Sequence, residues 1–389
     1  MAIYSRPRIL SSLSSLLIVA ATVAFVQPAS GLPLLDKVLP HKTPRPQAPA
    51  AELDETATLP PEKAKRIAKH TELGDTFFKR RDYTNALIEY EAVVKQDKDN
   101  FKAHYMLGKV LMAMSDYEEA LSEFQNVVRI RSTSSDAHYM TAEALRMLGR
   151  HEEAIAEYEN SLRVNTKYAP AHAYLAECYR MKGEYRVATR EAKEAIKLDP
   201  NLVVPYLVLA KCYSETRLPD LSIDNYKKAV GLDPKDPVTR TQFGVALGHM
   251  KKWSESENEL RKAVEADPNY APGHVGLSWI LAKRDKLEEA LEQARLAVSL
   301  APNDADTHSG LAWVYSQIGD HNSSVMQYRL ALRIDPKNPK LHKALGLALS
   351  DRGDIDGAIA ELLHTTKLMP HDYESELALK DLMQKRSQR

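Results

Sequence analysis

The sequence has little cysteine and no excess of charge of either sign. Its 389 residues include two cysteines, Cys178 and Cys212, and 53 basic residues balance 53 acidic ones. Surfaces that bind nucleic acid usually carry a basic excess, so this balance argues against that class of function. Two cysteines cannot form a disulfide framework, and we expect both thiols to be buried as small apolar groups.

The sequence also lacks the local motifs of common catalytic sites. It contains no glycine-rich phosphate loop, no nucleophile elbow and no cluster of His, Cys, Asp and Glu with the spacing of metal ligands. We therefore predict that the chain is not an enzyme and that it binds no cofactor and no metal ion.

One extended apolar run is present, near the N-terminus, at residues 16–26. Arg6 and Arg8 precede it, and the first acidic residue is Asp36. A run of this length suits the core of a signal peptide and is short for a membrane span. Residues 1–31 are therefore predicted to be a signal peptide or a signal anchor.

Two outcomes for this segment stay open. The small residues Ala29, Ser30 and Gly31 suit a cleavage site, and we favour cleavage. Counted from Ile9, the run reaches 18 residues, so an uncleaved anchor at 9–26 is the alternative. We expect the chain to be periplasmic or extracellular, or anchored with its remainder outside the cytoplasm. Residues 32–66 contain seven prolines and are predicted to be an extended linker.

The rest of the chain is dominated by a unit of 34 residues that occurs nine times between Ile67 and Asp372 without insertion or deletion. The eighth and twentieth places are small in every unit, and the twenty-fourth is bulky in most, as Ala142, Ala154 and Tyr158 illustrate. Small residues at fixed places let two helices approach closely, and bulky ones fill the gaps beside them. The units are 67–100, 101–134, 135–168, 169–202, 203–236, 237–270, 271–304, 305–338 and 339–372.

This spacing resembles the tetratricopeptide repeat, a helix–turn–helix of 34 residues. The resemblance implies an all-α fold, a right-handed superhelical α-solenoid, with one helix over about places 2–14 of each unit and a second over about places 16–29. Prolines at the ends of units and at helix starts agree with it. Residues 373–389 are predicted to form a helix that caps the last unit.

Histidine holds the fourth place in seven of the nine units. A ladder of metal or proton sites is one interpretation. Residues one unit apart are too distant to share a metal ion, so we favour a repeated packing residue. These histidines are His70, His104, His138, His172, His274, His308 and His342.

The resemblance implies that the first helix of each unit lines a concave groove. At the ninth place the last four units carry Val245, Trp279, Trp313 and Leu347, which predicts a continuous apolar ridge. Leu207 and Val275, at the fifth place, extend it. Exposed apolar strips that contain tryptophan often bind partners, although the tryptophans would alternatively pack between units.

The other half of the predicted groove is polar and rich in methionine. Tyr105 and Tyr139 share the fifth place, and Lys109, Arg146 and Arg180 add positive charge. Methionine suits adaptable surfaces, and the charges would orient a peptide or its carboxylate. The alternative is that these methionines fill gaps in the core.

The leading functional interpretation is a scaffold that holds an extended peptide or a helix of another protein in this groove. It would serve the assembly of an envelope or secretion complex. The alternative is an accessory subunit that presents substrate to an envelope enzyme such as a glycosyltransferase. A third interpretation, carbohydrate or small-ligand binding on Trp279 and Trp313, lacks convergent polar groups beside the rings.

Overall fold

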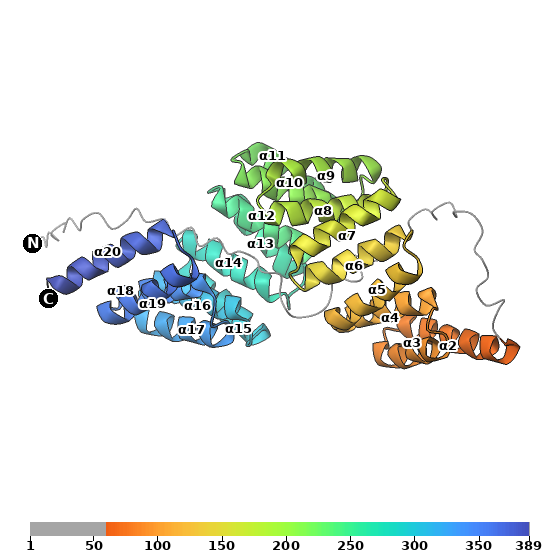
Figure 1. Cartoon of the computed structure of the whole chain (residues 1–389). Helices are drawn as coiled ribbons and strands as arrows, with labels where there is room; N and C mark the ends of the chain where they lie inside the picture. The colour runs from red at the N-terminus through yellow and green to blue at the C-terminus, as the bar shows by residue number, and fades with distance from the viewer. Residues whose placement is uncertain (1–59, 389) are drawn as a thin grey trace, which may run out of the picture. The chain divides into compact units, whose positions relative to one another are not determined.

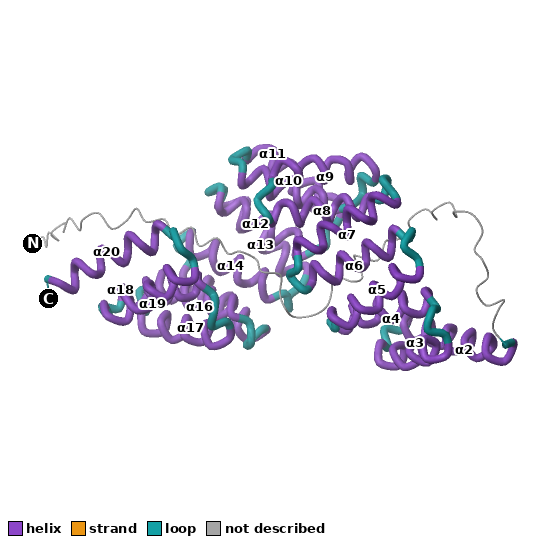
Figure 2. The backbone as a smooth tube through the Cα atoms, in the orientation of Figure 1, coloured by secondary structure: helices purple, strands orange, loops and turns teal. Residues whose placement is uncertain are grey.

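The computed structural model describes residues 60–388, and all regular elements in that range are α-helices. They follow one another as antiparallel pairs (Figure 1), and loops alternate with helices along the whole described chain (Figure 2). The predicted all-α fold of tandem helical pairs is confirmed. The predicted signal segment and most of the predicted linker lie outside the described residues.

Each pair consists of an A helix followed by a B helix. The A helices are α2 (Pro61–Lys79), α4 (Phe101–Met114), α6 (Ser135–Met147), α8 (Ala169–Met181), α10 (Val203–Glu215), α12 (Pro237–His249), α14 (Ala271–Lys283), α16 (Ala305–Ile318) and α18 (Pro339–Asp351). The B helices are α3 (Tyr83–Gln96), α5 (Tyr117–Ile130), α7 (His151–Val164), α9 (Tyr185–Leu198), α11 (Pro219–Leu232), α13 (Trp253–Ala266), α15 (Leu287–Leu300), α17 (His321–Ile334) and α19 (Ile355–Leu368). A last helix, α20 (Tyr373–Ser387), packs on α19.

The N-terminal boundary of the helical array differs from the prediction. Residues 61–66 were expected to belong to the linker, but α2 begins at Pro61. Proline is tolerated in the first turn of a helix because the N–H group that it lacks has no partner there. Two adjacent prolines therefore mark the start of this helix and do not prevent it.

The turn between the two helices of a unit has the same backbone in all nine units. The residue at the fifteenth place is left-handed throughout, with φ between 59° and 88°. Glycine, which adopts this conformation without strain, occupies only four of the nine places. The left-handed residues are Arg81, Ser115, Gly149, Gly183, Arg217, Lys251, Asp285, Gly319 and Gly353.

The small places of the repeat are where helices meet most closely. A Cβ atom added to Gly244 on α12 would lie 2.6 Å from Cγ of Leu260 on α13. Ala176 and Ala188, at the eighth and twentieth places of their unit, are both fully buried. The close approach of each helix pair thus follows from the repeated small residues.

The two cysteines are buried free thiols, as expected. Burial is the main cause that raises the pKa of Cys178 to about 12 and that of Cys212 to about 11. Both groups are therefore poor nucleophiles at neutral pH.

The helical array divides into two compact units, with the boundary between Glu123 and Phe124. In the second unit, α8 packs on α10, α12 on α14 and α14 on α16, all of them A helices. No two successive B helices in residues 124–388 pack to a similar extent. A stack that is tighter on one side curves toward that side, so the A helices lie on the concave side of this unit.

Candidate functional site

The surface considered for binding is the side of the A helices that faces away from the B helices, here named the A-helix face. Of the predicted site residues, Tyr105 and Lys109 belong to the first unit and the other nine to the second. In the first unit, Nζ of Lys109 lies 5.5 Å from the ring centroid of Phe78 and 5.7 Å from that of Tyr105. Lys109 is therefore held over two aromatic rings.

The repeated histidines join the two helices of each unit to the loop that precedes it. His138, for example, contacts Oε2 of Glu157 through Nδ1 at 2.7 Å and donates from Nε2 to the carbonyl of Ser132 at 3.1 Å. In every unit that carries it, the histidine contacts the residue 19 positions later, on the B helix. We name this pair of contacts the loop staple; it makes the histidine a structural hydrogen-bonding residue.

Two units keep the loop staple without histidine. Tyr206 donates from its hydroxyl to the carbonyl of Pro200 at 3.1 Å. Arg240 donates to the carbonyl of Pro234 at 2.8 Å and to Glu259 at 2.6 Å. The position therefore requires a long side chain with a donor, whatever its chemistry.

The partner on the B helix decides whether the histidine must be charged. Because Nε2 donates to a carbonyl, a neutral ring presents Nδ1 as an acceptor. A glutamine, as at Gln293 opposite His274, can turn its amide nitrogen toward that acceptor. A carboxylate, as at Glu191 opposite His172, can only accept, so this contact needs the imidazolium form.

The histidines do not form a metal ladder. In residues 60–388, no three His, Cys, Asp or Glu side chains come together in a way that would hold a metal ion. Each histidine already uses its ring nitrogens in its own unit, so the packing interpretation gains a specific geometry.

A ladder of charged side chains follows the A-helix face of α6, α8 and α10. Glu143 and Arg146 pair on α6 with 2.9 Å between Oε2 and Nη2. Glu177 and Arg180 occupy the same places on α8 and make two contacts of 2.7 and 2.9 Å. Lys211 holds the ninth place on α10, with Nζ 3.9 Å from Glu177. These five residues are named the charge ladder.

The inner end of the charge ladder is a buried network, which differs from the expectation of an exposed groove. Arg146 and Tyr139 are buried, with 7% and 4% of their surface exposed. The guanidinium of Arg146 lies 5.1 Å from the ring centroid of Tyr174, and the hydroxyl of Tyr158 donates to Glu143. Burial and the charge of Glu143 raise the pKa of Tyr139, so the phenol stays neutral.

The outer end of the charge ladder is more accessible. Arg180, Glu177 and Lys211 have side chains 21%, 18% and 28% exposed. Although burial opposes ionisation of Glu177, Lys211 and Arg180 hold its pKa below the ordinary value. The charges that can meet a ligand are therefore those of α8 and α10.

The predicted apolar ridge is present in part. Trp279, Trp313 and Leu347 are partly exposed, whereas Val245 is buried, with 9% exposed. A Cβ atom added to Gly248 would clash with the Trp279 ring, and the His249 ring lies 5.1 Å from it. Trp279 thus packs between α12 and α14, as the alternative interpretation required, and still presents part of its ring.

The remaining predicted residues fit the same pattern. Nζ of Lys283 lies 5.1 Å from the Trp313 ring centroid, which adds a cation beside the ridge. Leu207 and Val275 are partly exposed. The Val275 side chain would lie 3.0 Å from a Cβ atom on Gly310, so the glycine leaves room for it.

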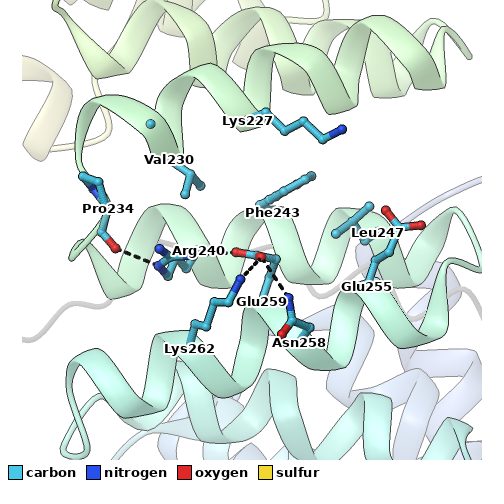
Figure 3. A pocket seen from close by; sticks show the side chains of 11 residues that line it. Lys227, Val230, Pro234, Arg240, Phe243, Leu247, Glu255, Asn258, Glu259 and Lys262 are labelled. Carbon is cyan, nitrogen blue, oxygen red and sulfur yellow. Dashed lines mark hydrogen bonds and ion pairs between the residues drawn. The ribbon is translucent and has the colours of Figure 1, made fainter.

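A cavity of about 430 Å³ lies away from this face, between α11, α12 and α13 (Figure 3). Apolar side chains of Val230, Phe243 and Leu247 line it, and the loop staple of Arg240 closes one side. Arg240 and Glu259 pair with each other there, so their charges are already balanced.

No helix in residues 60–388 combines the length and the apolar composition needed to cross a bilayer.

Family models match most of the repeat region. A tetratricopeptide repeat model matches residues 139–203 and 242–305, and a second one matches residues 205–236 and 305–338. A model of anaphase-promoting complex, cyclosome, subunit 3 matches residues 79–161. No curated protein sequence matches the chain.

Two solved structures share the fold. A tetratricopeptide repeat protein from Parabacteroides merdae is 17% identical, with 64% of this chain and 99% of that chain covered and a TM-score of 0.56. The APC/C hetero-tetramer Cut9-Hcn1 is 12% identical, with 83% and 63% covered and a TM-score of 0.56. Together with the repeat models and the tandem helical pairs, these likenesses identify the chain as a protein built of tetratricopeptide repeats.

Proposed function

We propose that the chain is a non-enzymatic scaffold that binds a segment of another protein along the A-helix face of its second unit. The observation that carries this proposal is the state of Trp279 and Trp313. Each ring is fixed by a neighbouring A helix, through Gly248 and Lys283, and each stays partly exposed. A preformed aromatic surface loses little entropy when it binds.

The proposal places this scaffold outside the cytoplasm, in the assembly of an envelope or secretion complex. The apolar run at residues 16–26, preceded by Arg6 and Arg8, supports export. Fractionation of cells that express the tagged full chain tests the location. Mass spectrometry of the mature N-terminus tests cleavage after Gly31.

Affinity capture with the full chain from its host tests the binding face. We expect the Trp279→Ala/Trp313→Ala variant to lose its specific partners, because tryptophan hot spots contribute about 2 kcal/mol or more each. Trp253→Ala, which changes the third tryptophan of the chain on a B helix, is the matched control and should keep them. Helical content is compared by circular dichroism in all three proteins.

The outcomes separate the functional alternatives. An unchanged partner set in the double variant would reject the ridge as the binding face. A stoichiometric glycosyltransferase or polymer synthase among the captured proteins would favour the accessory-subunit alternative over the scaffold.

A further inference from the structure

The charge ladder changes sign at its last step. The ninth place holds Glu143 on α6 and Glu177 on α8, each paired with an arginine three residues later. On α10 the ninth place holds Lys211, and Ser214 stands where the arginine would be. The charge ladder therefore contains three cations and two carboxylates, and Lys211 has no carboxylate of its own.

The nearest carboxylate cannot fully satisfy Lys211. Both oxygens of Glu177 already accept from Arg180, at 2.7 and 2.9 Å. The remaining separation of 3.9 Å between Nζ and Oε1 is longer than a hydrogen bond. Burial lowers the pKa of Lys211, and the attraction of Glu177 does not restore it.

The next A helix adds polar groups that also lack partners. On α12, the hydroxyl oxygen of Thr241 and the side-chain oxygen of Gln242 are buried without a hydrogen bond. Thr241 is fully buried. Buried polar atoms are normally hydrogen-bonded, so unpaired groups on two adjacent A helices point to a missing ligand.

We infer that Lys211 receives a carboxylate of the bound protein segment. This inference rests on the proposed function, because it specifies which chemical group of the segment meets the A-helix face. The segment is acidic at this point, through a Glu or Asp side chain or its own C-terminus. A carboxylate would add the one negative charge that the ladder lacks.

A carboxylate fits the available donors better than a phosphate does. The ladder has a single uncompensated positive charge, and the guanidinium of Arg180 is already bound to Glu177 in a bidentate contact. A phosphate group carries nearly two negative charges and three strong acceptor oxygens, so it normally requires an arginine or a cluster of donors. The neighbouring Leu207, partly exposed on the same helix, suits an apolar residue beside the carboxylate.

Defined peptide pools test this inference with the full chain immobilised. Each pool contains degenerate acetylated, amidated nonapeptides with a central Glu, Gln or phosphoserine next to leucine. A fourth pool keeps the central Gln but has a free C-terminal carboxylate. Bound peptide is quantified after washing, for the wild type and for Lys211→Met, Lys211→Arg and Lys193→Met.

We expect a carboxylate pool to be retained about tenfold more than the amidated Gln pool, since charge-assisted hydrogen bonds are the strong ones. The ratio should fall to about one in Lys211→Met, which keeps the length of the side chain. It should persist in Lys211→Arg and in Lys193→Met, which removes an exposed lysine from a B helix. The pool that responds, central Glu or free C-terminus, identifies the source of the carboxylate.

Three results would overturn the inference. One is a carboxylate preference that survives in Lys211→Met, and another is stronger retention of phosphoserine that depends on Lys211. The third is equal retention of all pools by the wild type, lost in Trp279→Ala/Trp313→Ala; that result would leave the scaffold standing without an acidic ligand. If no pool is retained above a blank surface, both proposals fail.

Discussion

Nδ1 of His172 lies 2.8 Å from Oε2 of Glu191, while Nε2 of the same ring contacts the carbonyl of Thr166 at 3.1 Å. Both contacts are satisfied together only by the imidazolium form. Burial disfavours that charge, but the hydrogen bonds to Glu191 and Thr166 outweigh it and raise the pKa of His172 above its ordinary value of 6.5. The loop staple in this unit is therefore an ion pair.

The His172 staple should make local stability depend on pH. Its contribution is fully present below pH 6.5 and is lost as the pH rises through the raised pKa of His172. His172→Gln should lower the protection of α8 and α9 amides by about 1–2 kcal/mol at pH 6, and by less at pH 9. Hydrogen exchange at the two pH values measures this, and an equal loss at both would contradict it. Glu191→Gln, which recreates the pair seen at His274, is the control and should show little pH dependence.

Breaking the buried end of the charge ladder should be costly. Glu143→Gln leaves the guanidinium of Arg146 buried without a counter-charge, and we expect the second unit to lose about 3 kcal/mol of local stability. Hydrogen exchange in α6 and α7 reports this loss. Glu153→Gln removes a carboxylate of similar geometry that pairs with Arg150 on the exposed surface, and it should cause no measurable change. Similar protection in both variants would show that Arg146 does not depend on its carboxylate.

Gly248 should control the position of Trp279. Gly248→Ala places a methyl group against the Trp279 ring, so we expect the ring to move and stability to fall by about 1–2 kcal/mol. In a background where Trp253 and Trp313 are phenylalanine, the emission of Trp279 reports the displacement. Gly231→Ala is the control, because nothing lies within 4 Å of an added Cβ atom there.

The two glycine variants should change stability in opposite directions. Gly231 lies inside α11, so alanine should stabilise this helix by about 0.5–1 kcal/mol. An unchanged emission maximum in Gly248→Ala would mean that Trp279 is not held by this contact. Such a result would also weaken the argument that its ring is fixed before binding.

The last helix should protect only its neighbours. Leu382 on α20 is 2% exposed and belongs to the apolar cluster around Leu362, while Lys343 bonds to Asp372 and Glu374. Removal of residues 373–389, or Leu382→Ala, should reduce amide protection in α18 and α19 by about 2–4 kcal/mol. Protection in α10 and α11 should stay unchanged. A loss spread evenly over residues 124–372 would refute this local behaviour.

The fold could be predicted from the sequence because its information is periodic. In the unit at 169–202, the expected first helix at about 170–182 is α8 (Ala169–Met181). The turn was harder to predict, since only four units carry glycine at a place that is left-handed in all nine. At positions such as Lys251, packing of the two helices imposes a conformation that the residue itself disfavours.

The candidate site could be predicted only in part, because contacts across helices depend on packing. The sequence placed Arg146 and Tyr139 on the binding surface, but Tyr174 and Glu143 cover them. It also missed the function of the repeated histidines. A signal was available: each of the seven has Glu or Gln 19 residues later, at the twenty-third place of its unit.

The unequal contacts of A and B helices have a mechanical consequence for the second unit. Its helical pairs are joined most firmly along the side where α12 meets α14 and α14 meets α16. A row of rigid bodies joined along one edge resists stretching at that edge and yields by opening at the other. Under load, this unit would therefore behave as a leaf spring, with its stiffness set by the small residues between the A helices.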